Sequence, residues 1–311
     1  MTMHFRLLAE QAMADGVIAA DEILTLRQAG WSNSVIDADE AEALFVLNDH
    51  LADSSAEWSD FFVEALSEYV VNGVMPRGYI DDGQAEWLIE RIDRDGRLGT
   101  MTELELLVRV LEKALGAPEP LKAYARDQIG QAVLTGEGPT RGGGALEPGK
   151  VNASEARLLR RMIFAPGSER PAAVGRSEAE MLFRLKDACL EADNAPEWMQ
   201  LFVQGVGNYL QGFGGSDPLS RERAAELESF MNESASNIGG FFSRMAKSDI
   251  RAGFSDLFGG KAEAPGHDEA VADAEAVTSE EQAWLQGRID ANGEVDAYDQ
   301  ALLDFLAEEA I

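Results

Sequence analysis

The 311-residue sequence is poor in residues that carry covalent or catalytic chemistry, with one cysteine and three histidines. The single cysteine, Cys189, excludes an internal disulfide framework and fits a reducing compartment. No apolar run approaches the roughly 18 residues that a membrane-spanning helix needs. The first stretch, MTMHFRLLAEQAMADG, lacks a long apolar segment with a small-residue cleavage site, so we expect a cytoplasmic protein.

Positive charge is also scarce, with 26 basic residues against 56 acidic residues and a formal net charge of -30. A surface this negative repels phosphate backbones and anionic lipids, which argues against nucleic acid as a partner. It suits a soluble protein that meets cations or the basic surfaces of other proteins. Apolar residues still make up 45% of the chain, which supports about two packed domains.

Catalytic signatures are missing as well. His4, His50 and His267 have no second histidine at a metal-binding spacing, and Cys189 has no CxxC partner. The sequence contains no GxSxG, no phosphate-binding GxxxxGK and no Rossmann fingerprint. We therefore expect a protein that is not an enzyme and that has neither catalytic residues nor a site for an organic cofactor.

What the sequence does contain is one pattern that occurs twice in the same order. AEALFVLNDHL at 41–51 matches AEMLFRLKDAC at 179–189, and WLIERIDRDGRL at 87–98 matches WLQGRIDANGEV at 284–295. GVIAADEILTL at 16–26 matches GKVNASEARLL at 149–159. Four further positions match in register: Trp58, Phe62, Val63 and Tyr69 with Trp198, Phe202, Val203 and Tyr209. The shared order indicates a tandem duplication.

The apolar residues recur at helical spacing, as in Leu44, Leu47 and Leu51, and alternating β-branched runs bounded by turns are missing. The sequence therefore predicts an all-α fold of two tandem, duplicated helical bundles joined by a Gly/Pro-rich linker. We place the first bundle at 1–136, the linker at 137–148 and the second bundle at 149–311. The second copy carries an insertion at about 213–276.

We expect neighbouring helices to be joined by turns in which an apolar residue is followed by a helix-capping residue. A glycine two residues earlier can take the left-handed conformation that ends a helix, as at Gly16, Gly78, Gly96, Gly149 and Gly293. A Glu or Gln three residues beyond the cap completes a capping box. We expect such turns at eight apolar residues: Ile18, Ile36, Ile80, Leu98, Val151, Val174, Val277 and Val295.

The same Gly-x-Ile-x-x-x-Glu spacing also occurs in EF-hand calcium loops. The recurrent ADGVIAADEILTL and DRDGRLGTMTELELL resemble turns of the TerB-like, tellurite-resistance helical superfamily, and they are similar to degenerate EF-hands. The resemblance covers short stretches of both copies. It implies an acidic helical bundle that acts as a cytoplasmic, metal-associated or stress-linked interaction module, and it does not imply an enzyme.

The calcium interpretation names candidate metal ligands in both copies. Arg91 and Arg288 occupy the first loop position, where calcium needs a carboxylate, so we expect only weak Ca²⁺ or Mg²⁺ binding. We expect Arg91 to pair with Asp93 or Asp49, and Arg288 with Asp290 or Asp187. The candidate ligands are Asp93 and Asp95 in the first copy and Asp290, Asn292, Asp296 and Asp299 in the second.

The insertion contains a locally cationic stretch, SNIGGFFSRMAKSDIRAGFSDLFGGK at 236–261. At helical spacing it has one apolar face and one basic face, which suits packing on the acidic bundle, docking on a partner protein or contact with a membrane surface. We rank these alternatives in that order. The candidate partner-binding residues are Phe242, Met245, Ile250, Phe254 and Phe258 on the apolar face and Arg244, Lys247 and Arg251 on the basic face.

These observations favour an acidic helical adaptor or regulatory protein that acts through protein–protein interaction, with weak divalent-cation binding. The alternative is a Ca²⁺-binding, EF-hand-like sensor or buffer that uses the loops at 290–299 and 93–103. Nothing in the sequence identifies the partner.

Overall fold

The computed structural model describes residues 16–30, 36–51, 54–74, 76–94, 97–141, 148–168, 173–212, 279–291 and 293–309. Eleven α-helices account for most of these described residues, and the prediction of an all-α fold is confirmed. Two short strands, β1 (Asp93–Arg94) and β2 (Arg97–Leu98), pair in antiparallel fashion. None of the described helices is long and apolar enough to cross a membrane.

The chain forms two compact units, which are described separately. The first unit comprises Met1–Lys150 and Arg157–Pro171, and the second comprises Val151–Ala156 and Ala172–Ile311. The first unit therefore includes most of helix α8 (Ala153–Ile163), which the sequence assigns to the second bundle.

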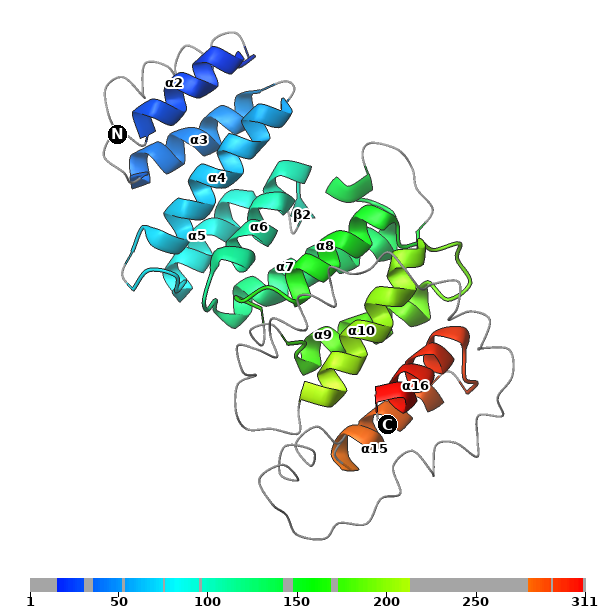
Figure 1. Ribbon diagram of the computed structural model, residues 1–311. Helices are drawn as coiled ribbons and strands as arrows, with labels where there is room; N and C mark the ends of the chain where they lie inside the picture. Colours follow the sequence, from blue (N-terminus) through cyan, green and yellow to red (C-terminus); the bar gives the residue numbers. More distant parts are fainter. Residues whose placement is uncertain are drawn as a thin grey trace. The chain divides into compact units, whose positions relative to one another are not determined.

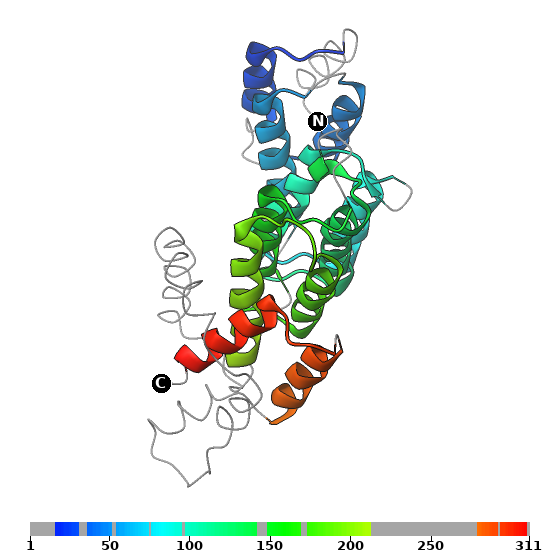
Figure 2. The same ribbon diagram turned by 90° about the vertical axis from the view of Figure 1, so that its right-hand side faces the viewer.

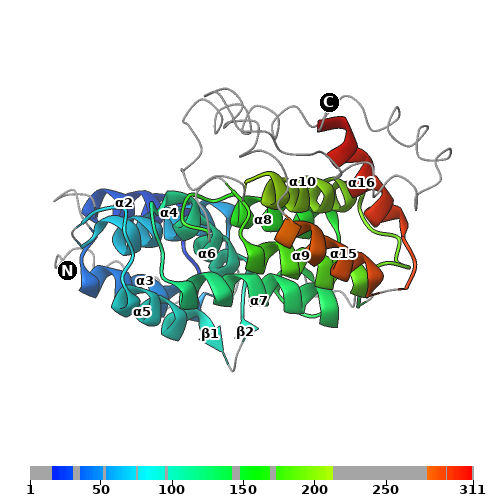
Figure 3. The same ribbon diagram turned by 90° about the horizontal axis from the view of Figure 1, so that it is seen from below.

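The first unit is built around α4, the longest helix of its N-terminal half. Trp58, Phe61 and Phe62 on α4 have no exposed surface, and each buried side chain of this kind stabilises a fold by about 1.5–3 kcal/mol. Helix α4 packs on α6, α2 and α3. Figure 3 shows α2 and α4 on one side of this unit and α3 and α5 on the other. The helices are α2 (Ala20–Gly30), α3 (Ala38–His50), α4 (Ala56–Asn72), α5 (Asp82–Ile92), α6 (Met101–Lys113) and α7 (Glu119–Thr135) (Figure 1).

The second unit has an equivalent centre in α10. Trp198, Leu201 and Phe202 on α10 are fully buried, and α10 packs on α9 and α16. Figure 2 shows α16, in red, beside α10, in yellow-green. The helices are α9 (Arg176–Ala188), α10 (Pro196–Gly212), α15 (Ser279–Asp290) and α16 (Ala297–Glu309).

Matching helices of the two predicted copies have nearly equal lengths. Helices α2 and α8 both have 11 residues, α3 and α9 have 13, α4 and α10 have 17, and α6 and α16 have 13. Helix α5 has 11 residues and α15 has 12. These lengths agree with the register of the sequence matches, although duplication itself stays a prediction from the sequence.

The helix-to-helix turns form as the capping chemistry predicts. Gly16, Gly78, Gly149 and Gly293 all have φ angles between 72° and 86°, while Gly96 lies outside the described residues. Asp37 with Glu40 and Asp81 with Gln84 both form complete capping boxes. The turn after Leu98 differs from the expectation, because its cap is Thr100, which forms the box with Glu103.

Part of the predicted linker is packed structure. Pro139–Arg141 forms a 3-10 turn, η1, that contacts α7 and α6. The side chain of Arg141 is buried, and its Nη2 donates a 2.6 Å hydrogen bond to the Lys150 carbonyl. Within the linker predicted at 137–148, residues 139–141 therefore pack on the first unit.

Two glycines of the second unit provide a test of its packing. A Cβ at Gly207 on α10 would lie 2.9 Å from Phe305 Cδ1 on α16, so Gly207→Ala should lower the free energy of unfolding by about 1–3 kcal/mol. A Cβ at Gly287 on α15 meets nothing within 4 Å, so Gly287→Ala should raise it by about 0.5–1 kcal/mol. Urea unfolding followed by circular dichroism measures both. Equal effects of the two substitutions would contradict this packing of α10 on α16.

Candidate functional site

Two of the carboxylates predicted to bind calcium in the second copy, Asp296 and Asp299, contact a buried lysine. Lys186 on α9 has no exposed side-chain surface. Its Nζ lies 2.6 Å from Asp296 Oδ2, 3.0 Å from Asp299 Oδ1 and 2.9 Å from Asp187 Oδ1. The ammonium also lies 5.5 Å from the centre of the Phe183 ring. A protein cation therefore lies where the calcium interpretation places a metal ion.

The matched position in the first copy shows what this lysine replaces. Lys186 corresponds to Asn48, whose Oδ1 accepts a 3.0 Å hydrogen bond from Trp58 Nε1. An ammonium cannot accept a hydrogen bond. The indole N–H of Trp198, which corresponds to Trp58, is buried and has no hydrogen-bond partner among the described residues. The first copy therefore has a neutral hydrogen bond between this position and the indole, and the second copy has charged hydrogen bonds between Lys186 and carboxylates.

Asp296 and Asp299 also cap helix α16. The Asp299 amide donates to Asp296 Oδ1 at 3.0 Å, and the Asp296 amide donates to Asp299 Oδ2 at 3.2 Å. Both carboxylates therefore have two roles, since they hold the first turn of α16 and bind Lys186. The sequence pattern predicted both aspartates as metal ligands but gave no role to Lys186. The signal that could have identified this residue is the change from asparagine to lysine at the position that matches Asn48.

The cluster shifts the pKa values of its members in opposite directions. Burial opposes the charge of Lys186, but hydrogen bonds to Asp296, Asp187 and Asp299 outweigh burial and raise its pKa. Burial alone would raise the pKa of Asp296, but the hydrogen bond from Lys186 holds it below its ordinary value. Burial raises the pKa of Asp299 to about 6 despite its contact with Lys186. Asp299 is thus the group that takes a proton first on acidification.

The other predicted site residues are not brought together in the described structure. Asp290 ends α15 and accepts a 2.8 Å hydrogen bond from Gln286, and Asp93 is the C-cap of α5. Asp95 and Asn292 lie outside the described residues. No group of three or more His, Cys, Asp or Glu side chains is arranged to hold a metal ion within the described part of the chain. The eight predicted partner-binding residues, Phe242, Arg244, Met245, Lys247, Ile250, Arg251, Phe254 and Phe258, also lie outside it.

The two loop arginines do pair with carboxylates, but the predicted partners were wrong. Arg91 binds Glu42 through two nitrogens, with Nη2–Oε1 at 2.6 Å and Nε–Oε2 at 3.0 Å. Arg288 Nη2 lies 3.1 Å from Glu180 Oε1. Glu42 and Glu180 occupy matched positions on α3 and α9. The arginines therefore join neighbouring helices within each unit instead of closing their own loops.

Each arginine also covers a tryptophan of its own helix. The Arg91 guanidinium lies 5.6 Å from the centre of the Trp87 ring, and that of Arg288 lies 5.9 Å from the Trp284 ring. Trp87 Nε1 donates a 2.9 Å hydrogen bond to Glu42. We call the set Glu42, Trp87 and Arg91 the glutamate clasp. The hydrogen bond from Arg91 lowers the pKa of Glu42 and keeps the clasp charged in mild acid.

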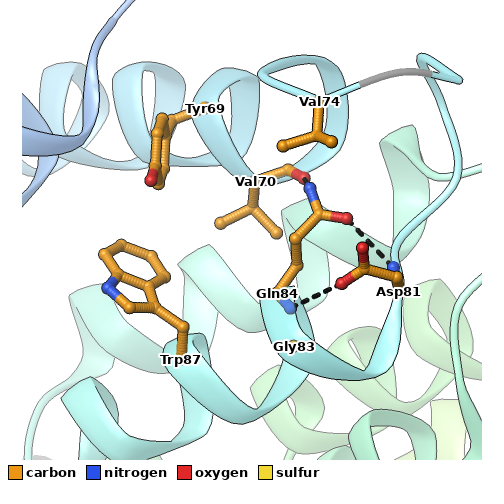
Figure 4. A pocket seen from close by; sticks show the side chains of 7 residues that line it. All are labelled: Tyr69, Val70, Val74, Asp81, Gly83, Gln84 and Trp87. Atoms are coloured by element: carbon orange, nitrogen blue, oxygen red, sulfur yellow. Dashed lines mark hydrogen bonds between the residues drawn. The ribbon is translucent and has the colours of Figure 1, made fainter.

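The glutamate clasp stands beside a pocket in the first unit (Figure 4). The cavity has a volume of about 290 Å³, near the small end of the roughly 300–1,000 Å³ typical of ligand pockets. Tyr69 from α4 and Trp87 from α5 lie together on one side of it, with Val74, Gln84 and Asp81 on the other. The lining residues are Tyr69, Val70, Val74, Asp81, Gly83, Gln84 and Trp87.

The walls of this pocket are fixed by contacts among its lining residues and with Phe45. The Tyr69 and Trp87 rings meet at 5.2 Å in an edge-on arrangement, and Phe45 packs on Trp87 at 5.6 Å. Gln84 is held at both ends, because its Nε2 donates to the Val70 carbonyl at 2.7 Å and its Oε1 accepts from the Asp81 amide at 3.0 Å. Burial raises the pKa of Tyr69, and the charge of Glu42 adds to the effect, so its hydroxyl stays neutral. The pocket is therefore formed in advance of any ligand.

Exposed apolar side chains extend the surface near the pocket. Val74, which lines the pocket, is 49% exposed, and Tyr79 and Leu115 are 51% and 59% exposed. Tyr79 and Gly116 form a bridge between the α4–α5 and α6–α7 connections, and the Leu115 amide donates to the Gly78 carbonyl. We call Val74, Tyr79 and Leu115 the apolar strip. Sequence spacing could not predict it, because two separate connections contribute to it.

The charge of Lys186 should prove essential to the second unit. Lys186→Met leaves Asp296 and Asp299 buried without their cation, so we expect a loss of about 3–5 kcal/mol in the free energy of unfolding near neutral pH. Without the ammonium, burial raises the Asp299 pKa further above 3.8, and the folded state then binds more protons than the unfolded state. The stability of the variant should therefore be greatest at low pH and should fall as pH rises through that pKa.

Urea unfolding at about pH 5 and about pH 7.5 measures this effect, with the smaller loss expected at the lower pH. Lys122→Met, a substitution of a half-exposed lysine on α7, provides the control. A loss that is the same at both pH values would contradict the proposed role of Asp299.

We found no match for the chain among protein-family models, curated proteins or solved structures. The resemblance to the TerB-like superfamily therefore stays a prediction from short motifs. A function is therefore inferred from the geometry of the chain itself.

Proposed function

We propose that this chain is a non-enzymatic adaptor or regulatory protein that binds a partner protein through the first unit. The pocket beside the Tyr69 and Trp87 rings would receive one apolar side chain of the partner. The apolar strip of Val74, Tyr79 and Leu115 would cover the flanking residues. The observation that carries the proposal is a preformed aromatic pocket that includes Val74, an exposed apolar side chain.

The dimensions and chemistry of the pocket support a protein ligand. A cavity of about 290 Å³ suits a single side chain better than a large cofactor. Tyrosine and tryptophan are the residues that most often dominate the binding energy of protein interfaces. The carboxylate of Asp81, which lines the pocket, already accepts the hydrogen bond that caps α5, so it serves the helix rather than a reaction.

Calcium binding by the second copy is the alternative, and we place it second. The loop at 290–299 would need the oxygens of Asp296 and Asp299, which contact Lys186. Calcium requires six to eight oxygen ligands and competes poorly with a resident ammonium. Weak divalent-cation binding elsewhere on this acidic chain, partner binding by residues 236–261 and a cytoplasmic location remain parts of the proposal.

Two valine substitutions of equal charge test the proposal. Val74 and Val46 are similarly exposed, at 49% and 45%, and both belong to the first unit, but only Val74 lines the pocket. Peptides selected from a phage-displayed library against the intact chain should bind Val74→Lys about tenfold more weakly, which corresponds to about 1.4 kcal/mol. They should bind Val46→Lys as they bind the parent chain.

Fluorescence anisotropy of labelled peptides measures these affinities. Circular dichroism of both variants checks that the fold is unchanged. Equal binding of the selected peptides to the two variants would overturn the assignment of the pocket as the binding site.

A further inference from the structure

The charges around the pocket indicate what kind of partner it fits. Residues 81–93, which include the whole of α5, contain five acidic residues and one basic residue, Arg91. Arg91 is bound to Glu42, so its charge is already balanced within the glutamate clasp. Arg77 is exposed in the connection between α4 and α5. The region stays negatively charged even when this arginine is counted.

Two carboxylates of α5 follow lining residues of the pocket at helical spacing. On a helix, residues three apart are neighbours on the surface. Glu86 is three residues beyond Gly83, and Glu90 is three residues beyond Trp87, so each carboxylate follows a residue that lines the pocket. Glu86 is exposed and the Glu90 side chain is 63% exposed. Together with Asp81 and Asp82 they form the acidic border of the pocket.

We infer that the partner segment is basic, with one aromatic or branched apolar side chain that enters the pocket and lysines or arginines that flank it. The inference rests on the proposed function and adds the chemistry of the ligand. The apolar side chain would lie against the Tyr69 and Trp87 rings. The flanking cations would meet the exposed carboxylates of the acidic border, which attract them over several ångströms.

An acidic border also selects against other partners. A segment with flanking glutamates would bring like charges together, which suppresses binding even when its apolar side chain fits the pocket. A neutral segment would gain the apolar contacts alone. The order of affinity is therefore basic, then neutral, then acidic, and the difference between basic and acidic segments should shrink at high salt because the border is exposed.

Three synthetic peptides test the inference on the full chain. They share one core with a central phenylalanine and differ only in flanking residues, which are lysine, glutamine or glutamate. We expect the lysine peptide to bind at least about tenfold more tightly than the glutamate peptide at low salt. Fluorescence anisotropy at low and high sodium chloride gives the affinities. The tenfold difference should narrow as salt increases.

A charge-matched pair of variants locates the effect. Glu86→Gln with Glu90→Gln removes two negative charges from the acidic border. Glu57→Gln with Asp60→Asn removes two exposed negative charges from the N-terminal part of α4, on the same unit but away from the lining residues. Only the first pair should weaken the lysine peptide, by about three- to tenfold, and the neutral peptide should be unaffected.

The outcomes separate this inference from the proposed function. Equal binding of the three peptides, still lost in Val74→Lys, would overturn the basic partner and leave the pocket as a binding site. Binding that Val74→Lys and Val46→Lys weaken equally would overturn the pocket itself. A peptide of residues 236–261 that binds more tightly than the lysine peptide, and that requires Val74, would replace the basic partner by the chain's own segment.

Discussion

The pocket depends on one glutamate of α3 that binds an arginine and a tryptophan of α5. Glu42 on α3 accepts hydrogen bonds from both Trp87 and Arg91 on α5. A half-exposed ion pair contributes little stability by itself, about 0–1 kcal/mol. Its importance is geometric, because a two-nitrogen contact fixes the guanidinium and the guanidinium covers one face of the indole. Tyr69 then packs edge-on against the fixed indole, and the two rings together form one wall of the pocket.

The two units share this pairing but differ in how they cap the matched helices α6 and α16. In the first unit the helix cap is a neutral threonine, Thr100, paired with the buried Glu103. In the second unit the cap is Asp296 with the buried Asp299, which places two carboxylates at one turn. Two buried carboxylates without a cation would be strongly unfavourable. Lys186 therefore balances the extra carboxylate. The lysine without the aspartate, or the aspartate without the lysine, would leave a buried charge unbalanced.

Local interactions were predictable from the sequence, and contacts between distant segments were not. The boxes of Asp37 with Glu40 and Asp81 with Gln84 join residues three apart, so spacing and residue type suffice to identify them. The predicted partners of the arginines were wrong for the opposite reason. Arg91 and Glu42 are 49 residues apart, so spacing in the sequence does not select Glu42 among the carboxylates of the chain. Lys186 and Asp299 are 113 residues apart, and only the structure brings them together.

The acidic border of the pocket is not explained by the stability of α5. Asp82 lies in the first turn, where the helix dipole favours a negative charge. Glu86 and Glu90 lie further along and are four residues apart, a spacing at which like charges destabilise a helix by about 0.2–0.5 kcal/mol. Arg91 offsets little of this, since its contact with Glu90 is 3.8 Å long and its main partner is Glu42. Glu86 and Glu90 repel one another in the free helix, and a bound cation would offset that repulsion by attracting both carboxylates. A basic ligand therefore explains the positions of these two carboxylates better than the stability of α5 does.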